Sequence, residues 1–258
     1  MPRPETTHPA GAIPLESDGS DDAWVVPVRD GWELDLGTLP HDRAATMRVG
    51  TDLVRSAELA VGSHGGGQVR LWVRGPDEVR LAIGEAAGMT VGREVLQLRR
   101  TLPVGEPWQL DVRPFVVGAD EEAWLTVNNR AFAWHPEQSG WTVDDLRRHE
   151  TAPWFDPAGF LLHEEAGRLL AFCWTKVHLD ADPPLGEIFV IAVDPTAHQR
   201  GLGRRIVLAG LDHLHQRGLT IGMLWVEATN EPALRLYRDL GFGVHCRDRA
   251  YQLHVPAR

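Results

Sequence analysis

The sequence predicts an α/β (α+β) protein built from two domains. Strand-like runs rich in Val, Ile and Leu alternate with amphipathic helical patterns along most of the 258 residues. Hydrophobic residues make up 43% and charged residues 24% of the chain, which is typical of a soluble globular protein. A proline- and glycine-rich break at 102–107 interrupts the alternation, and we place the domain boundary there.

The charge of the chain narrows the partners that it can bind. Asp+Glu 36 against Lys+Arg 26 gives a net charge of -10, which repels nucleic-acid phosphates and anionic membranes. We therefore expect a small neutral or cationic substrate, no nucleic-acid or membrane partner, and a monomer. The N-terminus lacks the basic-then-apolar order of a signal peptide, and no apolar run approaches the roughly 18 residues of a membrane span, so we expect a cytoplasmic protein.

The cysteines and histidines give no metal or disulfide pattern. Cys173 and Cys246 are too few for a disulfide framework and lack Cys-x-x-Cys spacing, so both are expected to be buried reduced thiols. No pair of histidines has a metal-binding spacing with a third ligand, so we predict no metal.

The first half of the chain has few strong signals. Residues 1–22 carry no apolar periodicity and are predicted to form a flexible tail. A hairpin around an Asp-Gly step, two helices and two further strands are then expected, at 24–28, 32–36, 42–61, 68–73, 77–87 and 91–100.

The second half, from about 108 to 258, is better punctuated. Strands are expected at 110–115, 160–163, 168–177, 187–193, 223–227 and 251–255, and helices at 121–133, from 142, from the loop at 198–203 to 217, and at 231–240. The nearly all-apolar run at 187–193 is typical of a central strand of a sheet.

The most informative segment follows that central strand. After Asp194-Pro195 comes a loop of sequence His-Gln-Arg-Gly-Leu-Gly, and a helix begins there. Gly201 and Gly203 allow backbone N–H groups to approach a ligand, and the helix N-terminus carries a positive partial charge. This loop is therefore suited to bind a pyrophosphate. The spacing matches neither the dinucleotide fingerprint nor a P-loop. A glycine-rich helix start used only for packing is the alternative interpretation of this loop alone.

A second motif lies 27 residues beyond Gly203, and together the two resemble a family. The stretch 230–242 reads Asn-x-x-Ala-x-x-x-Tyr-x-x-x-Gly-Phe, which resembles the GNAT acetyltransferases. That family binds acetyl-CoA through a Gln/Arg-x-x-Gly-x-Gly/Ala loop after a central strand. His198 stands where the family usually has Gln or Arg, although Gln199 and Arg200 follow it.

More unusual strings resemble the mycothiol synthase family of GNAT enzymes over about 110–253. They are 127–142 (VNNRAFAWHPEQSGWT), 154–157 (WFDP) and 174–178 (WTKVH). The resemblance implies an acetyl-CoA-dependent N-acetyltransferase that acetylates the cysteinyl amine of cysteine–glucosamine–inositol in the last step of mycothiol biosynthesis. Direct attack of the amine on the thioester needs no covalent enzyme intermediate.

The resemblance also implies roles for residues. Glu187 assists as base because only a neutral amine attacks, and Tyr237 protonates the leaving thiolate. A surface Glu at a strand end and a packed helical Tyr are the structural alternatives. Acetyl-CoA would be held by the strand backbone, the loop and the start of the later helix: Ile191, Ala192, Val193, His198, Gln199, Arg200, Gly201, Leu202, Gly203, Arg204, Asn230, Glu231, Pro232, Ala233, Leu234 and Arg235.

The acceptor residues implied by the resemblance are Glu137, Lys176, Glu187 and Trp225. Lys176 is the one Lys among 26 basic residues, which suggests a site that needs a compact ammonium. Trp225 stands where the family has a Tyr, so an indole N–H replaces a hydroxyl or the hydrogen bond is lost.

The family has two GNAT domains, and this chain departs from it in the first. Residues 41–105 resemble only the later part of that domain, so we expect a degenerate GNAT-like domain at 23–105 before the catalytic domain at 108–258. The shortened half keeps two alternatives open, namely a GNAT acetyltransferase for another small amine and a non-catalytic acyl-CoA-binding module.

Overall fold

The computed structural model describes residues 10–17, 22–135 and 138–258, and these divide into two compact units. Unit 1 contains the chain up to Leu96, Glu227–Thr229 and Cys246–Arg258, and unit 2 contains Gln97–Val226 and Asn230–His245. The division therefore differs from a single break at 105–108, because the C-terminal residues return to unit 1.

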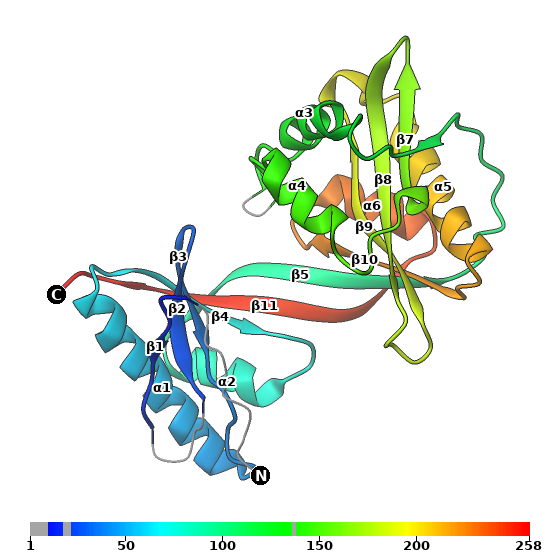
Figure 1. Ribbon diagram of the computed structural model, residues 1–258. Helices are drawn as coiled ribbons and strands as arrows, with labels where there is room; N and C mark the ends of the chain where they lie inside the picture. Colours follow the sequence, from blue (N-terminus) through cyan, green and yellow to red (C-terminus); the bar gives the residue numbers. More distant parts are fainter. Residues whose placement is uncertain (1–9, 18–21, 136–137) are drawn as a thin grey trace. The chain divides into compact units, whose positions relative to one another are not determined.

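In the described part of unit 1, the helices α1 (Arg43–Ser63) and α2 (Glu78–Ala86) accompany the strands of an α/β unit (Figure 1). Its strands follow the order β1-β2-β3-β4-β11, with β3 and β4 parallel and the other pairs antiparallel. A helix N-cap explains where α1 starts, since the Asp42 carboxylate accepts from the N–H of Ala45. The elements that lie wholly or mostly in unit 1 are β1 (Ile13–Pro14), β2 (Trp24–Val28), β3 (Gly31–Asp35), α1 (Arg43–Ser63), β4 (Gly67–Val73), α2 (Glu78–Ala86), β5 (Thr90–Thr101) and β11 (Gly243–Val255).

The start of the chain is more ordered than the predicted tail. Ile13 and Pro14 pair with Val25 and Trp24, and Leu15 is buried in the core of unit 1. Ile13, Pro14 and Leu15 are therefore part of the sheet and core of unit 1, and the prediction of a flexible tail is wrong for these three residues. Residues 1–9 and 18–21 lie outside the described part of the chain.

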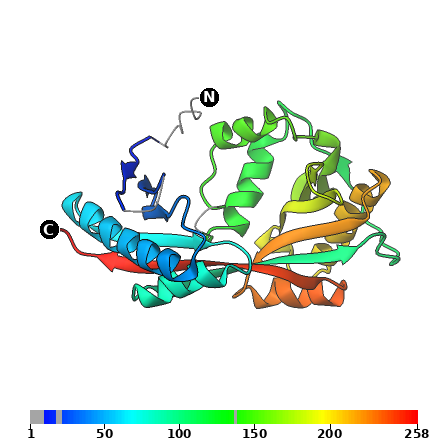
Figure 2. The same cartoon turned by 90° about the horizontal axis from the view of Figure 1, so that it is seen from below.

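The two helices of unit 1 pack on each other and on the strands. A methyl group added at Gly50 of α1 would collide with Ile83 of α2, so the small residue permits their close approach. Figure 2 shows both helices beside the strands of this unit. Val49, Leu53 and Val61 of α1 are buried in the same core, and their spacing is the helical periodicity that predicts this segment.

Unit 2 has the strand order β10-β9-β8-β7-β6, in which β9 and β10 are parallel and the others antiparallel. The predicted elements of the second half are present, although β6 is shorter than predicted and β11 is longer. They are β6 (Arg113–Pro114), α3 (Glu121–Ala131), α4 (Val143–Glu150), η1 (Pro157–Gly159), β7 (Phe160–Glu165), β8 (Arg168–His178), β9 (Leu185–Val193), η2 (Pro195–Ala197), α5 (Leu202–Gln216), β10 (Ile221–Glu227) and α6 (Glu231–Asp239).

Helices cover both faces of this sheet. On one face, Trp124 of α3 contacts Phe160, Phe172 and Trp174 of the strands edge to face, within an aromatic core. On the other face lies α5, where a methyl group at Gly210 would collide with Cys173. Figure 1 shows α3 and α4 on one side of β8 and β9 and α5 on the other.

Strand β9 contains a β-bulge. Trp174 pairs with Val190 and Thr175 with Ile188, so Phe189 is the extra residue of β9. The pairing of β9 with β10 ends at the same place, with Leu224 opposite Ile188, although both strands continue. Because a bulge bends its strand, the two strands separate and leave one edge of β9 unpaired beyond Ile188.

Candidate active site

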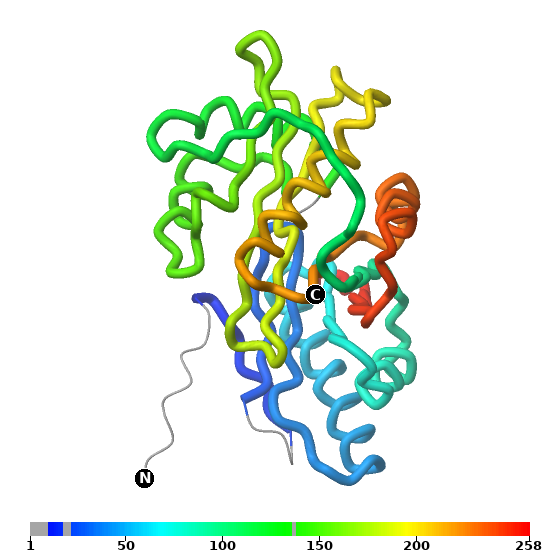
Figure 3. The backbone as a smooth tube through the Cα atoms, turned by 90° about the vertical axis from the view of Figure 1, so that its right-hand side faces the viewer, coloured from blue at the N-terminus to red at the C-terminus, as the bar shows by residue number. Residues whose placement is uncertain are grey.

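The loop after β9 brings backbone N–H groups to the start of α5. Gly201 is the N-cap with φ +70°, the left-handed region that favours glycine, and Gly203 lies in the first turn. The N–H groups of that turn have no acceptor within the helix, and α5 runs for 15 residues behind them. This start of the helix is therefore suited to a phosphate group. Figure 3 shows the chain running from β9 through this loop into α5.

Asp194 anchors the loop. It is 2% exposed, and one carboxylate oxygen accepts from the N–H and the hydroxyl of Thr196 at 2.9 and 2.6 Å. The other oxygen is 2.7 Å from Nη1 of Arg130 on α3. Burial favours the neutral acid, but the Thr196 hydrogen bonds and Arg130 outweigh it, so the pKa of Asp194 lies below its ordinary value. The loop is therefore fixed at its start by an ionised carboxylate.

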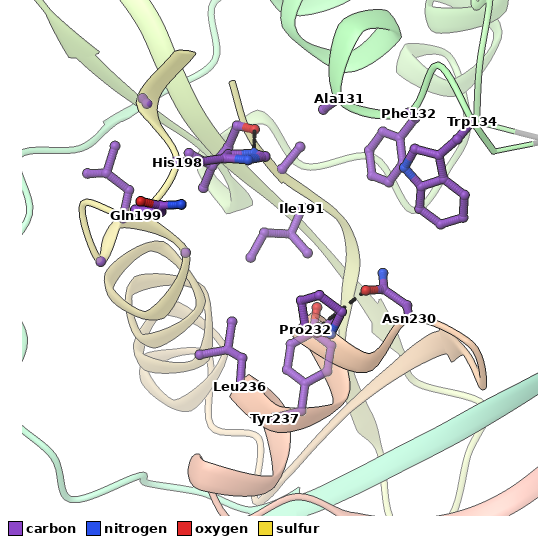
Figure 4. Close-up of a pocket in the computed structure, with 17 residues that line it drawn as sticks. Ala131, Phe132, Trp134, Ile191, His198, Gln199, Asn230, Pro232, Leu236 and Tyr237 are labelled. Atoms are coloured by element: carbon purple, nitrogen blue, oxygen red, sulfur yellow. Dashed lines mark hydrogen bonds between the residues drawn. The ribbon is translucent and has the colours of Figure 1, made fainter. Parts of the chain in front are cut away.

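The loop at 198–203 lines part of a pocket of about 590 Å³ (Figure 4). In Figure 4, Ile191 lies between the His198 side of the pocket and the Phe132–Trp134 side, and Leu236 and Tyr237 project from α6. The lining residues come from α3 and its following loop, β9, the glycine loop, α5 and α6: Ala131, Phe132, Trp134, Ile191, Ala192, Val193, Ala197, His198, Gln199, Gly201, Leu202, Gly203, Asn230, Pro232, Ala233, Leu236 and Tyr237.

The backbone of β9 presents polar groups to this pocket. Asp194 donates its N–H to the Leu170 carbonyl, and hydrogen-bonded pairs alternate along an antiparallel ladder. Ala192 therefore directs its backbone groups toward β8, while Ile191 and Val193 direct theirs to the edge that β10 has left. A ring nitrogen of His198 is 3.1 Å from the Val193 carbonyl oxygen. The exposed edge can thus pair with an extended ligand that carries amides.

Tyr237 supplies the phenol of the pocket wall. Asn230 caps α6 by accepting from the N–H of Ala233, which sets the start of the helix that carries Tyr237. The Tyr237 side chain is 6% exposed, and its hydroxyl has no hydrogen-bond partner among the described residues. Burial, with Cys173 nearby, raises the pKa of Tyr237 above its ordinary value, so this phenol remains protonated.

Polar side chains occupy one face of three neighbouring strands. Lys176 of β8 is opposite Glu187 of β9, and Glu187 is opposite Met223 of β10. Because paired residues share a face and side chains alternate, Trp225 lies on the same face as Lys176 and Glu187. We call Lys176, His178, Glu187 and Trp225 the polar face.

Within the polar face, Lys176 and Glu187 have different partners. The Lys176 ammonium lies 4.6 Å from the centroid of Trp154 and 5.5 Å from that of Phe189. Glu187 is 7% exposed, and its Oε2 is 2.7 Å from Nε2 of His178. A compact cation and a buried carboxylate are therefore presented side by side, which suits a ligand with an amine and hydroxyl groups.

Eleven of the sixteen residues predicted to hold acetyl-CoA line this pocket. The five that do not line it are Arg200, Arg204, Glu231, Leu234 and Arg235. All of these except Leu234 carry a charge.

Two of these charged residues, Arg200 and Arg204, pair with carboxylates outside the set. Arg200 binds the Glu165 carboxylate at 2.8 and 2.7 Å, and Arg204 binds Glu106 at 2.8 and 2.6 Å. These carboxylates compensate the guanidinium charges beside the loop. Glu137 lies outside the described residues.

Sequence reasoning missed five residues of the wall, which are Ala131, Phe132, Trp134, Ala197 and Leu236. Trp134 is 58% exposed, and a large exposed aromatic beside a pocket is the kind of signal that marks a binding surface. That exposure is known only from the structure, because the sequence around Trp134 has no periodicity that sets its direction.

No group of three or more His, Cys, Asp or Glu side chains among residues 10–17, 22–135 and 138–258 could hold a metal ion. In the same part of the chain, no helix is both long enough and apolar enough to cross a membrane.

The fold is that of the GNAT acetyltransferases. The model of the acetyltransferase (GNAT) family matches residues 126–242. A GCN5-related N-acetyltransferase from Sphaerobacter thermophilus superposes with a TM-score of 0.70 at 23% identity, covering 92% of this chain and 77% of the other. A tandem GNAT protein from the clavulanic acid biosynthesis pathway gives a TM-score of 0.65 at 15% identity, covering 92% of this chain and 79% of the other.

More similar sequences define the family. A mycothiol acetyltransferase from Acidimicrobium ferrooxidans is 44% identical over 238 residues, which cover 89% of this chain and 76% of the relative. One from Thermomonospora curvata is 49% identical over 196 residues, which cover 74% of this chain. The chain belongs to the mycothiol acetyltransferase family. It spans 65% of the length of the Thermomonospora curvata relative and of a Thermobispora bispora relative that is 51% identical.

Proposed function

We propose that this protein transfers the acetyl group of acetyl-CoA to the cysteinyl amine of cysteine–glucosamine–inositol, the last step of mycothiol biosynthesis. The observation that carries the proposal is one pocket that joins a helix N-terminus, an unpaired strand edge and a buried phenol. Its volume of about 590 Å³ lies within the usual 300–1,000 Å³ of small-molecule sites. Membership of the mycothiol acetyltransferase family supports the acceptor.

The donor would lie along the pocket from the loop to β9. The N–H groups of the first turn of α5 hold the pyrophosphate, while Ile191 and Val193 pair with the amides of the pantetheine arm. Because Glu165 and Glu106 already compensate Arg200 and Arg204, the backbone N–H groups carry most of the attraction for the pyrophosphate.

The acceptor would lie against Lys176, Glu187 and Trp225 of the polar face. Lys176 binds hydroxyl oxygens, and Trp225 offers its ring and indole N–H. Glu187 takes the proton of the attacking amine, and Tyr237 gives a proton to the sulfur as the C–S bond breaks. An incoming ammonium thus loses two protons, of which one leaves to solvent and one restores Tyr237. Strand N–H groups aimed at the carbonyl stabilise the developing oxyanion.

The proposal assigns no catalytic residue to unit 1. We infer that it is the degenerate GNAT-like domain, since it keeps the helix, strand, helix and strand of α1, β4, α2 and β5. The pocket described above is built from residues of unit 2. We also propose that the protein is cytoplasmic, because acetyl-CoA is supplied in the cytoplasm. We further propose that it is a monomer. Light scattering of the purified chain tests the monomer.

A mass-spectrometric assay tests the function. The protein is incubated with acetyl-CoA and cysteine–glucosamine–inositol in competition with free cysteine, glucosamine–inositol and spermidine. Acetylation of the first amine alone is the expected result. Preference for another amine would make the protein a GNAT acetyltransferase with a different acceptor, and binding of acetyl-CoA without turnover would make it an acyl-CoA-binding module.

A pair of matched variants separates the enzyme from the binding module. Glu187→Gln is expected to bind acetyl-CoA like the wild type and to lose most turnover. Glu122→Gln makes the same change on the exposed side of α3 and is expected to keep full activity. Equal turnover in the two variants would contradict the role of Glu187.

A further inference from the structure

The polar face contains a hydrogen bond that the proposed chemistry has not yet used. Nε2 of His178 lies 2.7 Å from Oε2 of Glu187, and the two side chains are 26% and 9% exposed. An ionised carboxylate only accepts hydrogen bonds, so the ring nitrogen donates. His178 and Glu187 are on neighbouring strands, and the bond crosses diagonally from His178, which pairs with Leu185.

This bond holds one oxygen of Glu187 and leaves the other available. Among the residues that the structure describes, no other side chain or backbone group donates to the Glu187 carboxylate. Lys176 is directly opposite on β8, but its ammonium lies over the Trp154 and Phe189 rings. His178 therefore fixes the rotation of the carboxylate, and Oε1 is the oxygen free to meet an acceptor amine.

The fixed rotation matters because a base must be within hydrogen-bond reach of the proton that it removes. A glutamate side chain has three rotatable bonds, and the wrong rotamer directs both oxygens away from the amine. A hydrogen bond to a charged group in a buried site is also stronger than a neutral one, so the orientation is held between turnovers.

We propose that His178 is a positioning residue that orients Glu187 for removal of the proton from the acceptor amine. The inference rests on the proposed function, and it assigns His178 no contact with substrate. Its role is to donate from Nε2 to Oε2, so a side chain that donates from the same place should replace it in part.

The test compares two substitutions at this position. His178→Ala removes the donor and is expected to lower kcat about 10- to 100-fold, which is less than the full contribution of a general base because Glu187 is still present, while KM for acetyl-CoA stays within about twofold. His178→Gln keeps an N–H group at a similar reach and is expected to recover most of the lost kcat. His215→Gln, on the exposed side of α5, is the matched control and should equal the wild type.

A double variant shows whether His178 acts through Glu187. If it does, His178→Ala has no further effect on kcat in a Glu187→Gln background, because the oriented carboxylate is already absent. Titration with acetyl-CoA by calorimetry gives the fraction of folded sites in each variant, so misfolding is not counted as lost catalysis.

The outcomes separate the inference from the function. The positioning role would be overturned if His178→Ala were as active as an active wild type. It would also be overturned if the effects of His178→Ala and Glu187→Gln on kcat were additive. Either result would leave the proposed acetyltransferase activity intact. If the preferred amine is not the cysteinyl one, the same comparison is made with that amine. A wild type that acetylates none of the amines removes both the proposed function and this inference.

Discussion

The two tyrosines of the chain permit a test of the proposed general acid, Tyr237. Tyr237→Phe removes one hydroxyl oxygen from a ring that is 6% exposed, and that hydroxyl has no hydrogen-bond partner among the described residues. Because no protein hydrogen bond is lost, the free energy of unfolding should change by less than about 0.5 kcal/mol. The ring remains packed against Phe242, so acetyl-CoA should bind as before.

The catalytic effect should be much larger. A positioned general acid contributes about 10²–10⁴ in rate, which corresponds to about 2.7–5.4 kcal/mol at 1.36 kcal/mol for each tenfold. We therefore expect kcat of Tyr237→Phe to fall at least about 100-fold in a continuous assay of thiol release, with KM for acetyl-CoA little changed.

Tyr251→Phe is the matched control. Tyr251 is also buried, but it lies in unit 1 and donates to Oε1 of Glu85 at 3.3 Å. Its removal should cost about 1 kcal/mol of stability and leave kcat unchanged. The reasoning would be refuted if Tyr237→Phe kept wild-type kcat, or if its lost activity tracked lost folded protein in urea titrations.

Four further outcomes follow from the same structure. Gly201→Ala meets open space but places a side chain at φ +70°, so it should cost about 1–2 kcal/mol in urea unfolding and raise KM for acetyl-CoA. Asp194→Asn weakens the bond to Arg130 and should likewise raise that KM, whereas unchanged kinetics would show that the loop needs no anchor. Because burial raises the pKa of Tyr237, the acid stays protonated through pH 10, and kcat measured from pH 7 to 10 should show no loss from its ionisation. Burial lowers the pKa of His213 from 6.5, so the folded state binds fewer protons there, and its contribution to stability is present above pH 6.5 and falls as the pH drops through the folded pKa. Urea midpoints at pH 7 and pH 5 should therefore differ less in His213→Gln than in the wild type.

Local signals in the sequence determined the helices and strands and the glycine loop at 198–203. Asp42, Thr142 and Asn230 cap helices through their own side chains, so the helix starts could be predicted from neighbouring residues alone. The glycine loop and the Asn-to-Phe motif keep fixed spacings, which is why most of the predicted donor residues meet in one pocket.

Other features depend on partners far away in the chain. The bulge at Phe189 is a mismatch between two strands, so neither strand shows it alone. Leu15 is buried because β1 finds an edge beside β2, which one segment cannot reveal. Arg200 is paired with Glu165, a residue 35 positions earlier, although its place in the loop suggested a phosphate contact.

The sequence by itself determined the local patterns, namely the α/β alternation, a glycine loop at a helix start and a tyrosine at the motif position. Only the tertiary structure decided which side chains share a face. It brought His178 to Glu187, placed Lys176 over Trp154, and added Trp134 to the pocket wall. The physical reason is that periodicity and capping depend on near neighbours, whereas strand register and bulges arise only when distant segments pair.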